Sequence, residues 1–225
     1  VAMTRTFDFG GEVFAIAGDA ALFWPARKAL LVSDLHLEKA SSYAARSGQM
    51  LPPYDSLATL HELSALIDGH DLDTVYCLGD NFHDDEGEAR LSGEAATLLR
   101  ALTGRIEWHW ITGNHDREVS GLWGGTAHDE LDIGSILLRH EAEADCQRPE
   151  ISGHFHPKYR FHHRGRNVSR RCFVVGETKI IMPAFGALTG GMDAAHRAIV
   201  RACGDKPLMA LVPTDGKFAR FPLAA

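Results

Sequence analysis

Five apolar stretches of this 225-residue chain end in the same way, with a polar residue of a type that binds metal ions. The five stretches read LLVSDLH, VYCLGDN, WITGNHD, ILLRH and ISGHFH. Short apolar runs of this kind are typical of buried strands. In open α/β sheets the carboxyl ends of neighbouring strands meet at one edge, where their side chains can converge. The pattern therefore predicts a fold built on sheets, with one site assembled from five segments.

Other apolar runs and helical spacings complete the predicted architecture. We predict strands at Val13–Ile16, Ala29–Ser33, Thr74–Leu78, Ile106–Thr112, Ser135–Arg139, Phe173–Val175, Lys179–Met182 and Leu208–Val212. Leucines recur at helical steps between Pro53 and Gly69, and again from Ala95 to Leu102 before Gly104. Strands and helices alternate early and strands dominate later, which indicates an α/β (α+β) fold, a two-sheet β-sandwich flanked by helices.

Length and composition limit the classes of protein that fit. A chain of 225 residues, 45% hydrophobic and 24% charged, fits one globular domain over residues 1–225, and Met3 fits a native start. No apolar run approaches the roughly 20 residues that span a bilayer, so we expect a cytoplasmic protein without a membrane partner. The net charge of −7 argues against coating nucleic acid by charge alone. Four widely spaced cysteines are expected to be reduced and mostly buried.

The polar residues at the strand ends form a mixed set of nitrogen and oxygen donors. They are Asp34, His36, Asp80, Asn114, His115, His140, His154 and His156. Imidazole favours Zn, Fe, Mn or Ni, whereas carboxylate and amide oxygens favour Mn or Mg. No thiolate belongs to the set. The donors therefore indicate Mn, Fe or Zn rather than calcium or an iron–sulfur cluster.

The ordered set resembles the signature of the calcineurin-like metallophosphoesterase family, over residues 34–156. The resemblance implies that Asp34, His36 and His156 hold one divalent ion, and that Asn114, His140 and His154 hold a second. It implies that Asp80 bridges the two ions. Manganese is the expected metal, with iron or zinc as alternatives. Two such ions activate water and clamp phosphate oxygens for hydrolysis.

The resemblance also implies residues that act on the substrate. His115 is expected to protonate the leaving oxygen, with Asp116 as the partner that orients its ring. The GDNFH run is similar to a form found in the nuclease branch, which implies that His83 faces the substrate; the alternative is a solvated loop histidine. One departure is Glu141 after His140, where many relatives have glycine.

The segment Lys158–Arg171 contains six lysines and arginines and no acidic residue. It could hold a phosphate backbone, or it could be a solvated hairpin. Five histidines lack a motif and are expected to be ordinary core or surface residues: His61, His70, His109, His128 and His196. The tryptophans at 108, 110 and 123 are expected in the core.

Two further stretches, Asp34–Ser42 and Met182–Gly191, resemble the PdeM group of bacterial ligase-associated DNA damage response endonucleases. We therefore expect a phosphodiesterase that cuts DNA in the course of DNA repair. Association with a DNA ligase and a helicase is implied by the resemblance alone. The alternatives are a hydrolase of nucleotides, cyclic nucleotides or a lipid pyrophosphate, and an inactive metal-binding scaffold. The oligomeric state stays open.

Overall fold

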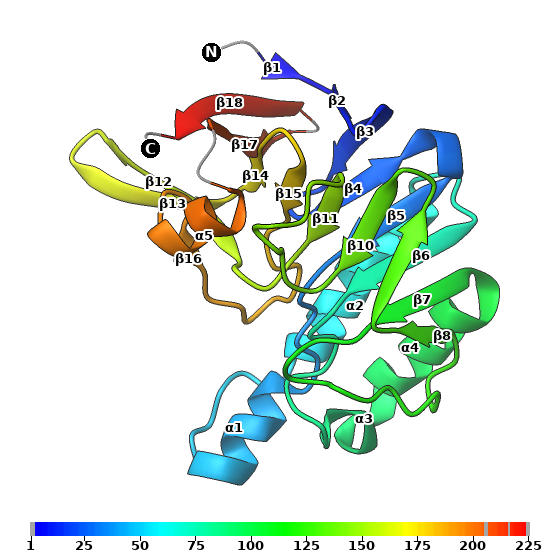
Figure 1. Ribbon diagram of the computed structural model, residues 1–225. Coiled ribbons are helices and arrows are strands. Elements are labelled where there is room, and N and C mark those ends of the chain that lie inside the picture. The colour runs from blue at the N-terminus through cyan, green and yellow to red at the C-terminus, as the bar shows by residue number, and fades with distance from the viewer. Residues whose placement is uncertain (1–2, 205–206, 216, 224–225) are drawn as a thin grey trace.

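Two large β-sheets face one another in the computed structural model, which describes residues 3–204, 207–215 and 217–223 (Figure 1). Val1 and Ala2, which precede the expected native start at Met3, lie outside the described residues. The strands are β1 Met3–Thr4, β2 Thr6–Phe9, β3 Glu12–Ala17, β4 Ala21–Trp24, β5 Ala29–Val32, β6 Thr74–Leu78, β7 Glu107–Ile111, β8 Thr126–His128, β9 Glu130–Ile133, β10 Ile136–Arg139, β11 Glu150–Ser152, β12 Pro157–His163, β13 Arg166–Arg171, β14 Phe173–Val175, β15 Lys179–Ile181, β16 Met192–Asp193, β17 Leu208–Thr214 and β18 Lys217–Leu223. The helices are η1 Pro25–Arg27, α1 Lys39–Ser47, α2 Asp55–Asp68, α3 Gly87–Arg90, α4 Gly93–Arg105 and α5 Arg197–Ala202.

The first sheet runs in the order β2-β3-β4-β5-β6-β7-β8. Its strands from β5 to β8 are parallel, and every residue of β5 and β6 is buried. Continuous burial is expected of parallel strands that are covered on both faces. Because these strands point the same way, the loops after Val32, Leu78 and Ile111 leave the sheet at one edge.

The second sheet runs in the order β1-β18-β17-β14-β15-β11-β10-β9. It is mostly antiparallel, but β11 lies parallel to both β10 and β15. The residues that follow β10 and β11 therefore leave this sheet together. Those residues carry the His140 and His154 motifs.

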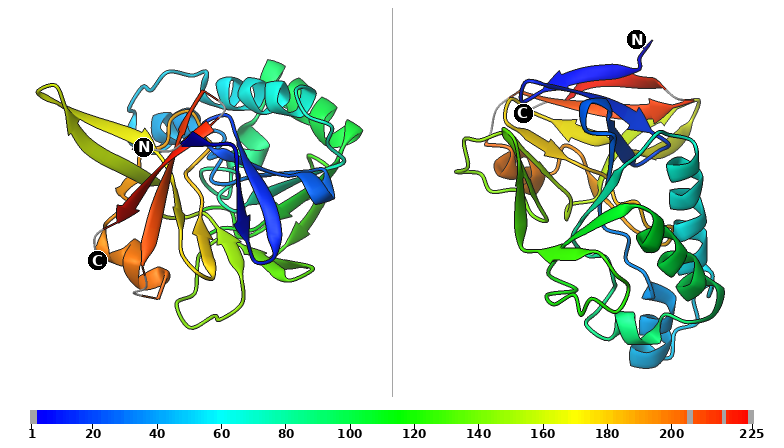
Figure 2. Two further views of the ribbon diagram at one scale, coloured as in Figure 1. Left: turned by 90° about the horizontal axis from the view of Figure 1, so that it is seen from above. Right: turned by 90° about the vertical axis from the view of Figure 1, so that its right-hand side faces the viewer.

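Three apolar clusters hold the layers together. One lies between the sheets and includes Phe14, Trp24 and Phe173, all fully buried. A second packs α2 and α4 onto the outer face of the first sheet, through Leu63 and Leu99 among others. Figure 2 shows these two helices together on one flank of the molecule. A third packs α5 against the second sheet, so helices flank both sheets.

Two elements extend from this body. Strands β12 and β13 form a hairpin whose outer part projects away from the sheets (Figure 1). Helix α1 lies at the opposite end of the view from β1 and has few apolar contacts, since only Ala40 and Ser42 are buried among its residues.

The predicted fold class is confirmed, and all eight predicted strands lie within or overlap observed ones. The two predicted helices correspond to α2 and α4. Helices α1, α3 and α5 and the short helix η1 were missed, as were several strands, among them β4 and β18, because their sequences are short or weakly apolar. Within the described residues, no helix combines the length and the apolar character needed to cross a bilayer.

A buried ion pair provides a test of the packing of the second sheet. Lys179 is 1% exposed; its ammonium donates to the carbonyl of Cys146 and lies 3.2 Å from Oε2 of the fully buried Glu150. Replacing Lys179 by methionine removes the nearest cation from a buried carboxylate, so urea unfolding should show a loss of about 3 kcal/mol or more. The double variant Lys179→Met/Glu150→Gln should recover part of that loss. Equal stability of wild type and the single variant would contradict this account.

Candidate metal centre

The loops that follow β5 and β6 are joined by a ladder of main-chain hydrogen bonds. The amides of Asp34, His36 and Leu37 donate to the carbonyls of Gly79, Asp80 and Asn81. The amide of His83 donates back to Leu37, and Leu37 and Phe82 form a bridge. The pairing thus continues beyond the strands, and it fixes the two loops to one another before any side chain acts.

Three glycines allow the side chains of the site to come together. A Cβ at Gly79 would overlap the imidazole of His140, one at Gly113 would overlap Asp80, and one at Gly153 would overlap Asp34. Each glycine precedes a predicted ligand in the sequence. Any larger residue at these positions would push a side chain out of the cluster.

Left-handed backbone conformations are concentrated at the site. Nine non-glycine residues have positive φ among those described, and five of them belong to the predicted ligand set. These five are Asp34, His36, Asp80, His154 and His156. Aspartate and histidine enter the left-handed region more readily than most residues, and strained backbone is concentrated at functional sites.

The side chains form two groups that share one carboxylate. In the first, donor atoms of Asp34, His36, Asp80 and His156 lie within 4.8 Å of one another. In the second, the same holds for Asp80, His140 and His154. The amide oxygen of Asn114 lies 3.0 Å from Nε2 of His140 and adds an oxygen donor to the second group. Asp80 is therefore placed to contact two ions at once.

The buried carboxylates of this cluster have no cationic side chain beside them. Asp34 is 0% exposed and Asp80 is 2% exposed, and in the described part of the chain neither forms an ion pair with a lysine or arginine. Burial lowers the pKa of His36 to about 2, so its ring is neutral and keeps a free lone pair. Buried negative charge needs a compensating positive charge. Imidazole nitrogens gathered beside carboxylates form a donor set that suits divalent metal ions. The donor set thus fits the expected ions.

His115 lies beside this cluster with its ring half-exposed. Its amide donates to Oδ1 of Asp80 at 2.9 Å, and its Nε2 lies 3.9 Å from Oδ2 of the same residue. Its Nδ1 lies 2.9 Å from the carbonyl oxygen of His83. Because a carbonyl only accepts, Nδ1 carries a proton, and Nε2 is the ring atom free to give or take one.

The predicted pairing of Asp116 with His115 is wrong. The Asp116 carboxylate accepts from the amides of Asn81, Phe82 and Gly113 and from the side-chain amide of Asn81. It therefore ties the loop after β6 to the loop after β7, and the carbonyl of His83 orients His115 instead. Burial raises the pKa of Asp116 to about 7, although the hydrogen bonds from Asn81 and Phe82 favour the ionised form.

His83 joins the site through its ring. Its Nδ1 lies 3.3 Å from Nδ1 of His36, and its ring is stacked on His115 with centroids 5.2 Å apart. Burial, followed by the charge of Lys39, lowers the pKa of His83 to about 4. His83 is also stacked on Tyr43 of α1. Tyr43 was missed from the sequence, because nothing in the spacing of α1 distinguishes it.

Glu141, the departure from the family pattern, is accommodated without positive φ at that position. Its carboxylate lies 3.6 Å from Nε2 of His154. The other ring nitrogen of His154, Nδ1, lies 3.1 Å from Nε2 of His140. Glu141 and His140 therefore contact different nitrogens of the His154 ring.

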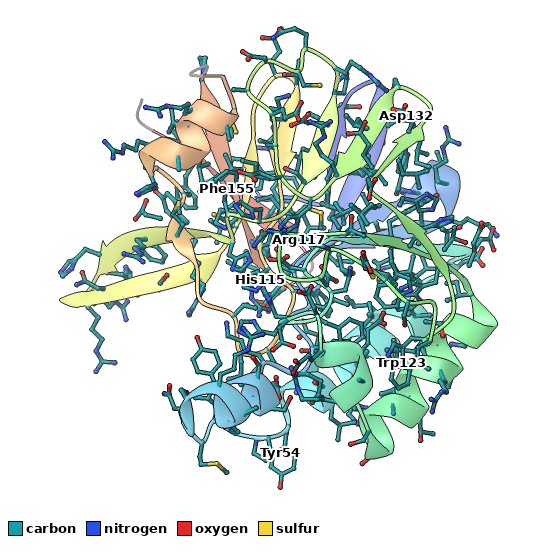
Figure 3. All side chains as sticks on the ribbon, turned by 60° about the horizontal axis from the view of Figure 1, so that its bottom comes forward. Tyr54, His115, Arg117, Trp123, Asp132 and Phe155 are labelled. Carbon is teal, nitrogen blue, oxygen red and sulfur yellow. The ribbon has the colours of Figure 1, made fainter. Side chains whose placement is uncertain are left out.

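The basic segment forms the β12–β13 hairpin, which begins directly after His156. At its base Arg171 donates to the carbonyl of Gly186. The amide of Gly186 in turn donates to the carbonyl of Asp34, which links the hairpin to the site. The arginines at 160, 164, 166 and 170 are exposed. In Figure 3, this hairpin extends to the left of His115, and α1 lies below it.

The tryptophans, histidines and cysteines that were not expected to belong to the site lie outside the metal-binding groups of the described residues. Trp108, Trp110 and Trp123 are at most 3% exposed, which confirms them as core. None of the five histidines without a motif enters a metal-binding group among the described residues; His109 contacts His128, and His196 caps α5. Three of the four free cysteines are buried, and Cys146 is half-buried.

Comparison with known proteins gives one matching family model and several similar structures. The family model for calcineurin-like phosphoesterase matches residues 27–182. Nuclease MPE from Pseudomonas putida is similar in structure, with a TM-score of 0.70 and 29% identity, over 92% of this chain and 96% of that chain. A Vps29 double mutant from Entamoeba histolytica matches with a TM-score of 0.33 and 17% identity, over 87% and 99% of the two chains. No curated protein sequence matches significantly.

The contacts of Asp116 predict a structural effect of its removal. In Asp116→Asn an NH2 group replaces one acceptor oxygen, so at least one buried donor loses its partner. The free energy of unfolding of the metal-free protein should fall by about 1–3 kcal/mol. His115→Gln, a change at the adjacent half-exposed residue, should alter it by less than about 0.5 kcal/mol. Equal effects of the two changes in urea unfolding would contradict the assigned role of Asp116.

Proposed function

The chain belongs to the calcineurin-like phosphoesterase family and is a metal-dependent phosphoesterase, and from this premise we propose that it hydrolyses phosphodiester bonds in DNA with two divalent ions. One observation carries the proposal. Two groups of buried and half-buried nitrogen and oxygen donors share Asp80, and the same carboxylate accepts a hydrogen bond from the amide of His115.

We assign the ligands by group. Asp34, His36 and His156 would hold one ion, and Asn114, His140 and His154 the other, with Asp80 in contact with both. Manganese suits this mixture of imidazole, carboxylate and amide oxygen, and iron or zinc would also fit. When bound, such ions acidify water and offset the charge of a phosphate group.

The protein's own groups complete the chemistry. The carbonyl of His83 keeps the proton of His115 on Nδ1, which directs Nε2 toward the substrate. From there the protonated ring can donate to the oxygen of the departing alcohol as the phosphorus–oxygen bond breaks. The ring of His83, stacked on His115, lines the same approach and would contact the phosphodiester from the side of α1.

Two observations favour a nucleic acid over a small phosphoester. The β12–β13 hairpin carries exposed arginines and projects away from the sheets (Figure 1), so an extended polyanion would contact it. The similar protein from Pseudomonas putida is called a nuclease. A role in DNA repair, and association with a ligase and a helicase, stay predictions from the sequence.

The role of His115 can be tested through the leaving group. His115→Ala should retain two equivalents of manganese by elemental analysis but lose about 100- to 10,000-fold in turnover of single-stranded DNA, whose alkoxide leaving group needs a proton. The loss should be much smaller with bis-p-nitrophenyl phosphate, since nitrophenolate leaves without protonation. His61→Ala, at an exposed histidine on α2, is the control. Undiminished DNA cleavage by His115→Ala would refute the assignment.

The hairpin predicts a salt-dependent contribution to substrate binding. Arg164→Gln/Arg166→Gln should raise KM for single-stranded DNA. It should also reduce the steepness with which the log of the association constant falls with log salt concentration, by about 1.4, or about 0.7 for each lost phosphate contact. Cleavage of bis-p-nitrophenyl phosphate should not change. The matched control is Lys28→Gln/Arg105→Gln, which removes the same charge beside the amino ends of β5 and β7. Identical salt slopes for both double variants would exclude the hairpin as a DNA contact.

A further inference from the structure

We infer that Tyr43 and Arg46 of α1 form a nucleotide subsite beside the metal centre, in which a base of single-stranded nucleic acid stacks on Tyr43 and a phosphate lies against Arg46. The inference rests on the proposed function and specifies which part of the substrate this side of the site binds. Neither residue belongs to the family pattern in the sequence.

A continuous stack of rings leads from the site to this position. The centroids of His115 and His83 lie 5.2 Å apart with 22° between the ring planes. Those of His83 and Tyr43 lie 5.6 Å apart with 26° between the planes. The tyrosine thus extends the plane-parallel series that starts at the expected proton donor, and a nucleobase on Tyr43 would continue it.

The space beside the stack is a cavity of about 230 Å³, lined by Ser42, Tyr43, Arg46, Ser47 and His83. It contains an aromatic face, a guanidinium group and two hydroxyl groups. An aromatic platform with an adjacent cation is the combination by which proteins bind single-stranded nucleic acid without reading its sequence. No acidic residue occurs in α1, Lys39–Ser47, so the helix carries only positive charge on its side chains.

Tyr43 is not needed to hold α1 in place. The helix is attached through polar contacts: the amide of Ala40 donates to Asp55, and Arg90 donates to the hydroxyl of Ser41. Tyr43 itself is 36% exposed. These polar contacts leave the exposed part of the Tyr43 ring available to a base.

Arg46 is free to turn toward a phosphate. Its side chain is 66% exposed and lies 3.4 Å from Oδ2 of the buried Asp84. Asp84 already accepts from Arg90 at 2.7 Å through its other oxygen. If Arg46 moves to the substrate, Asp84 therefore keeps its ion pair with Arg90, and the loop that contains His83 and Asp84 stays attached.

The position of α1 also gives the substrate a direction. Helix α1 and the β12–β13 hairpin lie on different sides of His115 in Figure 3. A strand that stacks on Tyr43 would pass the metal centre and continue toward the hairpin. Bases held in a duplex cannot stack on Tyr43, so the subsite favours single strands.

The test compares an oligonucleotide with a base-free analogue of equal length, made of tetrahydrofuran residues, which keeps every phosphate. Dissociation constants are measured by fluorescence anisotropy on manganese-loaded protein that carries His115→Ala, to slow cleavage. Tyr43→Ala should weaken binding of the normal oligonucleotide about ten-fold, within the range for one lost base stack. It should leave binding of the base-free analogue unchanged, and Tyr43→Phe should bind both as the parent does.

Two further variants complete the design. Arg46→Gln should weaken binding of both ligands equally, because both keep their phosphates. Tyr54→Ala, at a more exposed tyrosine before α2, should change neither. Equal weakening of both ligands by Tyr43→Ala, or no weakening of either, would overturn the subsite, as would absence of any binding. Cleavage of the normal oligonucleotide by the wild-type protein is scored separately, so a chain that binds but does not cut would contradict the proposed function alone.

Discussion

Two buried carboxylates without cationic side chains beside them, Asp34 and Asp80, are the constraint on which the rest of the site depends. Taking such charges out of water is unfavourable unless something positive replaces the water. In this fold the surroundings are instead imidazole rings and main-chain amides, including the amides of His115 and His154. Bound divalent cations would supply the positive charge that these carboxylates lack.

That constraint explains why the site requires two sheets. Asp34 and Asp80 leave the parallel strands β5 and β6, whereas His140 and His154 follow β10 and β11 of the other sheet. The apolar core between the sheets brings these strand ends within reach of one another. Main-chain bonds from Phe185 and Gly186 to Ser33 and Asp34 then tie the second sheet to the first ligand loop. The geometry of the metal centre therefore depends on the packing of the two sheets against one another.

The sequence could predict the centre of the site because its residues follow a rule of strand ends and glycines. It predicted the strands well where apolar runs were buried, as at Thr74–Leu78, and missed α1, whose residues are mostly polar or small. It assigned Asp116 to the wrong partner, because neighbours in sequence suggested a pair that the turn geometry separates. Tyr43 and Arg46 left no signal, since their position beside His83 depends on how α1 is anchored through Ala40 to Asp55 and through Ser41 to Arg90.

The division between centre and rim has a physical origin. Ligands at the centre are fixed by the shape of the strand ends, so the chemistry they support is shared by chains with very different substrates. The rim consists of α1 and the β12–β13 hairpin, which share few apolar contacts with the core and can vary without disturbing it. Here both rim elements offer positive charge and aromatic surface, on different sides of His115. The proposed substrate, a long and flexible polyanion, would contact both elements at once.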